Sequence, residues 1–65
     1  MKSKYVWSMD KTRKVPLSRI KDFLIRRNQD KFRVTGWLAD SDFIVIGEYS
    51  TEEEAIAIID ELTEE

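Results

Sequence analysis

The chain has 65 residues, a net charge of −2 at pH 7, no cysteine and no histidine. A chain of this length supports one small core, because only about 60% of the unfolded surface becomes buried at this size. The lack of cysteine excludes disulfide bonds and thiolate metal sites, and the lack of histidine removes the commonest general base at neutral pH. We therefore expect a single non-enzymatic domain over residues 1–65, with no cofactor, no metal and no small-molecule substrate.

The apolar segments are short. The longest of them runs from Phe43 to Ile46, whereas a membrane span requires about 20 residues. The N-terminal residues also lack the apolar stretch of a signal peptide. We expect a cytoplasmic protein that makes no membrane contact.

The first elements in chain order are two strands, at about residues 4–9 and 12–17, joined by a turn at Asp10 and Lys11. Tyr5 and Trp7 share one face of the first strand, because side chains alternate across a sheet. We expect both rings to belong to the core or to cover one end of it. The alternative is that they line a groove for a partner.

Residues 16–27 fit two structures. Pro16 suits the first position of a helix, and the apolar spacing behind it continues to residue 27. Phe23 and Ile25, however, make the apolar face broader than that of a small surface helix. We favour a turn at Ser18 and Arg19 followed by a strand over residues 22–27, with the helix as the alternative.

The clearest strands follow. Residues 31–38 alternate with period two, and residues 42–49 are rich in β-branched and aromatic side chains. The turn formers ADSD at residues 39–42 join them, which predicts a hairpin.

The C-terminal segment predicts an amphipathic helix over residues 51–63. A capping box is available, either from Ser50 with Glu53 or from Thr51 with Glu54. Apolar residues recur behind it at helical spacing, and Ile59 lies at the centre of that stripe. We expect Ile59 to be buried against the sheet.

Charge is divided unevenly along the chain. Residues 1–33 hold all 11 lysines and arginines with three acids, a net charge of +8, and residues 34–65 hold ten acids and no base. Such a division predicts either a basic binding surface or a chain that pairs with copies of itself.

Strand alternation places part of the basic half on one sheet face. If Phe23 and Ile25 point inward, the outward residues of the third and fourth strands include two arginines and a tryptophan; the predicted set is Leu24, Arg26, Arg33, Thr35 and Trp37. Cations that bind phosphate beside apolar groups that contact bases are typical of a nucleic-acid interface. The alternative is that Trp37 closes the core and the arginines are merely solvated.

Two resemblances accompany these patterns. The sequence IGEYSTEEEA at residues 46–55, together with VPLSRI at residues 15–20, resembles small uncharacterised proteins of phages and prophages of Gram-positive bacteria, a group without an assigned activity. The match covers about residues 13–62.

The sequence KVPLSRIKDFL at residues 14–24 also resembles the second strand and turn of the archaeal seven-kilodalton chromatin proteins. That resemblance implies an SH3-like five-stranded barrel, built from a two-stranded hairpin and a three-stranded sheet, with a C-terminal helix. It also implies that the barrel binds the DNA minor groove with its triple-stranded face. The chain departs from this family because Leu24 replaces the tryptophan that wedges into DNA, the following loop is longer, and the last 32 residues are acidic.

These features predict a small binding module. The first hypothesis is nucleic-acid binding through the basic sheet face, and the alternative is protein binding, as a phage-encoded inhibitor or adaptor of a host protein. A continuous basic face would favour nucleic acid, whereas bases neutralised by the helix acids would favour a protein partner. The sequence leaves DNA, RNA, protein and self-association open as partners.

Overall fold

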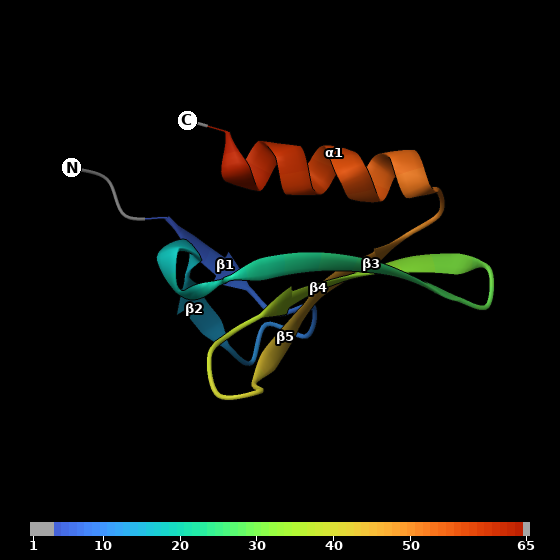
Figure 1. Cartoon of the computed structure of the whole chain (residues 1–65). Coiled ribbons are helices and arrows are strands. Elements are labelled where there is room, and N and C mark those ends of the chain that lie inside the picture. Colours follow the sequence, from blue (N-terminus) through green and yellow to red (C-terminus); the bar gives the residue numbers. More distant parts are fainter. Residues whose placement is uncertain (1–3, 65) are drawn as a thin grey trace.

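The computed structural model describes residues 4–64 and is mainly β, with one C-terminal helix, as expected (Figure 1). The elements in chain order are β1 (Tyr5–Trp7), β2 (Lys14–Pro16), a 3₁₀ turn (Leu17–Arg19), β3 (Asp22–Asn28), β4 (Lys31–Trp37), β5 (Phe43–Tyr49) and α1 (Glu52–Thr63). All five strands lie at the predicted places, although β1 and β2 are shorter than the sequence suggested and β3 is one residue longer.

The strands form two sheets. β1 pairs antiparallel with β2, and β3, β4 and β5 form an antiparallel sheet in that order. A backbone hydrogen bond joins the sheets, in which Met9 N donates to Val45 O at 2.8 Å along the free edge of β5. The predicted two-stranded and three-stranded sheets are therefore confirmed, whereas no closed barrel is formed by the strands of residues 4–64.

The alternative helix over residues 16–27 is wrong. Only Leu17–Arg19 form one 3₁₀ turn, and β3 begins at Asp22. Phe23 and Ile25 decide between the two structures, since both are partly buried while their neighbours along the strand are exposed, a period of two rather than 3.6.

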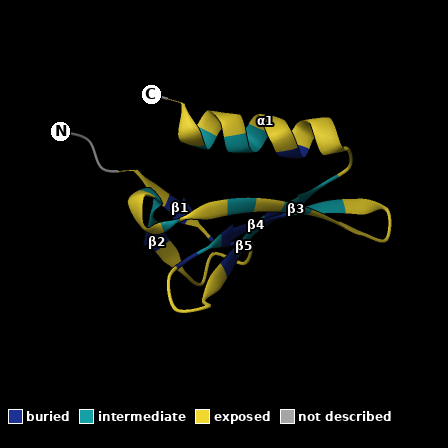
Figure 2. Cartoon of the chain, in the orientation of Figure 1, coloured by how far each residue is buried: buried dark blue, intermediate teal, exposed yellow. Residues whose placement is uncertain are grey.

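We call the face of the three-stranded sheet that carries Phe23, Ile25 and Val34 the inner face. The helix contacts all three strands and lies over this face (Figure 1). Val34 and Ala55 are both fully buried between the layers. Ile59 is only half-buried, so its expected burial is partly correct. Figure 2 shows this distribution, with the exposed positions of α1 turned away from the sheet.

The two-stranded sheet covers the other end of the inner face. Val15 of β2 forms a buried cluster with Leu38 and Ile44, against which Ile20 packs. Ile20 lies so close to the backbone of Gly36 that a Cβ there would come within 3.2 Å of it. Glycine at this position therefore lets the segment after the 3₁₀ turn lie directly on β4.

The helix begins at the predicted cap. Thr51 is the N-cap residue, and its hydroxyl accepts a hydrogen bond from Glu54 N at 3.1 Å. The Glu54 carboxylate in turn accepts from Thr51 N at 3.3 Å, which completes the capping box. No helix within residues 4–64 is long and apolar enough to cross a membrane.

Candidate nucleic-acid interface

The outer face of the three-stranded sheet lies opposite the helix. The register pairs Leu24 with Thr35 and Arg26 with Arg33 across β3 and β4. It also pairs Trp37 with Phe43 across β4 and β5. The face thus brings together all five residues predicted from the sequence and adds residues from β5, namely Phe43, Val45 and Glu48.

The five predicted residues are not equally accessible. Arg26 is exposed and Leu24 is 36% exposed, whereas Thr35, between Leu24 and Val45 in the register, is buried. Trp37 is half-buried on the outer face and does not close the inner core. Thr35 therefore supports its neighbours and offers a ligand little surface.

The Arg33 guanidinium is bound to Glu48. Nε and Nη2 of Arg33 both donate to the same oxygen, Oε2 of Glu48, at 2.9 and 2.6 Å. Asn28 Nδ2 donates to that oxygen as well, at 3.3 Å. These hydrogen bonds, from Arg33 first, hold the pKa of the Glu48 carboxyl below its ordinary value. Nη1 of Arg33 takes no part in the ion pair and can still donate to a ligand.

The other bases of the outer face are not neutralised in this way. Among the residues that the structure describes, ion pairs join Arg13 to Asp42 and Arg33 to Glu48, and no carboxylate of the helix takes part in one. Arg26 and Lys31 are both exposed, and neither has an ion-pair partner within residues 4–64. The basic half of the sequence therefore keeps free cations on the face opposite the acidic helix.

Two aromatic rings lie at one end of this face. The ring centroids of Trp37 and Phe43 are 5.2 Å apart, with the planes tilted by 45°. Phe43 is 49% exposed. The predicted four-residue turn at residues 39–42 would have paired Phe43 with Leu38, so Phe43 was not among the predicted site residues; the observed register pairs it with Trp37.

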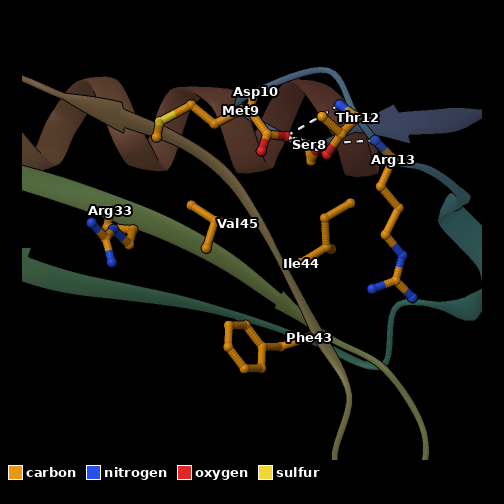
Figure 3. A pocket seen from close by; sticks show the side chains of 9 residues that line it. All are labelled: Ser8, Met9, Asp10, Thr12, Arg13, Arg33, Phe43, Ile44 and Val45. Atoms are coloured by element: carbon orange, nitrogen blue, oxygen red, sulfur yellow. Dashed lines mark hydrogen bonds between the residues drawn. The ribbon is translucent and has the colours of Figure 1, made fainter.

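A pocket of about 360 Å³ lies beside these rings, at the free edge of β5 (Figure 3). Phe43, Ile44 and Val45 line it from β5, and Arg33 lies on the sheet side. The turn between β1 and β2 supplies the opposite wall, from Ser8, Met9, Asp10, Thr12 and Arg13. No sequence motif marked this pocket, because its walls come from segments about 30 residues apart.

A second aromatic surface lies on the hairpin. Tyr5 is 51% exposed and Trp7 46% exposed, because Val6 takes the inward position between them. Lys14 Nζ lies 4.9 Å from the Tyr5 ring centroid and 5.3 Å from that of Trp7. The prediction that Tyr5 and Trp7 belong to the core is therefore wrong; both rings face outward with a cation between them.

Comparison with known proteins gives no further guide. No family model matches the chain, and no curated protein and no solved structure is similar enough to count as a match. The two resemblances stated above therefore stay predictions.

Proposed function

We propose that the chain is a small cytoplasmic binding module that takes single-stranded nucleic acid on the outer face of its three-stranded sheet. The observation that carries the proposal is the combination, on that face, of one exposed and one half-buried ring with exposed cations that have no ion-pair partner within residues 4–64. Trp37 and Phe43 form the aromatic part, and Arg26 and Lys31 supply charge for phosphates. Stacking of bases on rings, together with a basic surface along the backbone, is how sequence-tolerant single-strand binders work.

The charge across the sheet supports the same proposal. The helix carries five acids and no base, and it covers the inner face. The five helix acids, which would repel a phosphate backbone, therefore lie behind the sheet, and Arg26, Lys31 and Arg33 lie in front of it. Two outer-face acids, Asp22 and Glu48, reduce the positive charge there, so the binding should be weak.

The architectural part of the proposal is an SH3-like small barrel. The order of a two-stranded sheet, a 3₁₀ turn, a three-stranded sheet and a C-terminal helix agrees with that plan. The Met9 to Val45 hydrogen bond is where the two sheets approach closure. A solution structure in which the turn after β1 leaves the edge of β5 would count against it.

The direct test is fluorescence anisotropy with labelled single strands and the matching duplex at low salt. We expect single strands to bind more tightly than the duplex, because the outer-face rings can stack only on unpaired bases. For about three phosphate contacts, log affinity should fall against log salt with a slope of about −2. A folded protein that binds neither form would refute the proposal.

The hairpin surface favours a second candidate, a protein partner. Tyr5 and Trp7 expose two large rings in a small area, and aromatic residues are enriched at protein interfaces. On this hypothesis the chain is an inhibitor or adaptor that binds a host protein through the hairpin. The chain would then capture that host protein from a bacterial lysate after nuclease treatment. Trp7→Ser should abolish that capture, and Trp37→Ser should leave it intact. The reverse result would exclude the hairpin as the contact surface.

A further inference from the structure

The pocket at the free edge of β5 has the position of a base-binding subsite. It opens beside Phe43, so it is continuous with the ring surface proposed to stack bases. Its volume of about 360 Å³ is in the lower part of the range of sites that hold small organic ligands, about 300–1,000 Å³. Met9 and Val45 give it apolar walls suited to the flat faces of a heterocycle, and the buried Ile44 lies between Phe43 and Val45 on the same strand (Figure 3).

The turn that forms the outer wall is held in place. Met9 N donates to Val45 O at 2.8 Å, which fixes the turn to β5. The Arg13 guanidinium makes two hydrogen bonds to the Asp42 carboxylate, at 3.3 and 2.6 Å, and so ties the turn to the loop before β5. The pocket is therefore largely formed before a ligand arrives, which lowers the entropic cost of binding.

Asp10 supplies the polar group of this wall. One of its oxygens, Oδ1, accepts from Ser8 Oγ at 2.7 Å and from Thr12 N and Oγ1 at 3.1 and 2.7 Å. These bonds, from Thr12 first and then Ser8, keep the pKa of the Asp10 carboxyl below its ordinary value. No group within residues 4–64 donates to the other oxygen, Oδ2, which leaves one oriented anionic acceptor at the rim.

We propose that this pocket takes one unpaired guanine of the bound strand, with Asp10 Oδ2 accepting from its N1–H and N2–H₂ groups. The proposal rests on the single-strand binding proposed above. Guanine is the base that presents two neighbouring donors on its Watson–Crick edge. The N3–H of thymine or uracil lies between two carbonyl oxygens that repel a carboxylate. The amino groups of adenine and cytosine lie next to a ring nitrogen whose lone pair also repels a carboxylate.

Phosphates on either side of that base have cations within reach of the pocket. Arg33 lines the sheet side, and its Nη1 is not used by Glu48. Arg13 lines the other wall, and its bonds to Asp42 come from Nη1 and Nη2, which leaves Nε free to donate within the described residues. The subsite therefore combines an acceptor for the base edge with donors for the backbone.

The test compares a labelled thymidylate hexamer with the same hexamer carrying one central guanine. The guanine strand should bind about fivefold to tenfold more tightly, the lower part of the range for one good base contact. Replacing guanine by hypoxanthine, which lacks the N2 amino group, should remove part of that preference. The methyl signal of Met9 should shift with the guanine strand and stay near its free position with the thymidylate strand.

Asp10→Asn provides the matched variant. The amide oxygen can still accept from Ser8 and Thr12, so the turn is kept, but an NH₂ group, which donates, replaces the second oxygen. The guanine preference should disappear while the affinity for thymidylate stays unchanged. Asp40→Asn, the same change in another turn, should alter neither the guanine preference nor the affinity for thymidylate. Equal affinities for the two hexamers, or a preference that survives in Asp10→Asn, would overturn the guanine subsite and leave single-strand binding intact. No binding of either hexamer would overturn both.

Discussion

Trp37 and Phe43 face each other across β4 and β5, with ring centroids 5.2 Å apart, at the end of the sheet where the chain turns through residues 39–42. Because the helix lies over the inner face, it does not cover this pair, and Phe43 is 49% exposed. A half-buried ring beside an exposed one offers a stacking surface without being required to close the core.

Replacing Phe43 by alanine should weaken single-strand binding about tenfold, since base stacking contributes about 1–3 kcal/mol for each base. The slope of log affinity against log salt should stay the same, because no cation is removed. Anisotropy titrations at three or more salt concentrations measure both quantities. Trp7→Ala, which removes an equally exposed ring from the hairpin, is the control and should bind as the parent does. Equal losses in the two variants would argue against the outer face.

Arg26 and Arg27 are neighbours on β3 that occupy opposite faces of the sheet, because Arg26 is in register with Arg33 and Arg27 with Phe32. Arg26→Ala should therefore flatten the salt dependence for single strands by about 0.7 of a slope unit, the contribution of one phosphate. Arg27→Ala should change it little. The same anisotropy titrations measure both slopes. Equal slopes for the two variants would mean that the nucleic-acid strand does not follow the outer face.

The pKa of the Glu48 carboxyl should depend on Arg33. In the folded chain the Arg33 hydrogen bonds, followed by that of Asn28, lower this pKa below its unfolded value. The ionised form is thus favoured by folding. The stabilisation is present above the unfolded pKa and is lost as the pH falls through the folded value.

Carboxyl NMR titration of the parent and of Arg33→Met tests this relationship. The pKa of Glu48 should rise toward its ordinary value in the variant. Asp10, whose pKa is lowered by Thr12 and Ser8, should titrate as before. An equal pKa of Glu48 in the parent and the variant would mean that the ion pair does not persist in solution.

Ser41→Gly should stabilise the fold. Asp40 and Ser41 have φ values of 64° and 63°, the pair of positive angles of a type I′ turn. Serine is strained in this region, whereas Asp-Gly is a preferred pair for such a turn. We expect a gain of about 0.5–1 kcal/mol in the free energy of unfolding, measured by urea denaturation. A loss of stability would show that the turn has another conformation in solution.

Ile59→Ala should lower the free energy of unfolding by about 2 kcal/mol, the lower end of the range for such truncations, because Ile59 is only half-buried. Ile56→Ala is the matched control on the same helix. Ile56 is 44% exposed, so its truncation should change stability by no more than about 0.5 kcal/mol. Equal effects would mean that the helix has a different face against the sheet.

The strongest patterns in the sequence predicted local structure. The capping box at Thr51 and Glu54 located the start of the helix, and the alternation of residues 31–38 with the turn at residues 39–42 predicted the second hairpin. Alternation also placed Leu24, Arg26, Arg33, Thr35 and Trp37 on one face, because a strand assignment alone decides which side chains share a side. Between two assignments for residues 16–27, the broad apolar face created by Phe23 and Ile25 favoured the strand, which the structure confirms.

Contacts between distant segments were beyond such patterns. That Tyr5 and Trp7 face outward depends on which side of β1 meets the core, and both sides carry apolar residues that could have filled that role. The pairing of Arg33 with Glu48 needs the register of β4 and β5, in which an irregularity between Val34 and Thr35 shifts the partners. The pocket needs the Met9 to Val45 hydrogen bond, which joins residues 36 positions apart. Sequence by itself determined the elements and which side chains share a face, since these depend on neighbouring residues. The tertiary structure alone decided which faces are covered and which charges are paired, since these depend on how the two sheets and the helix pack.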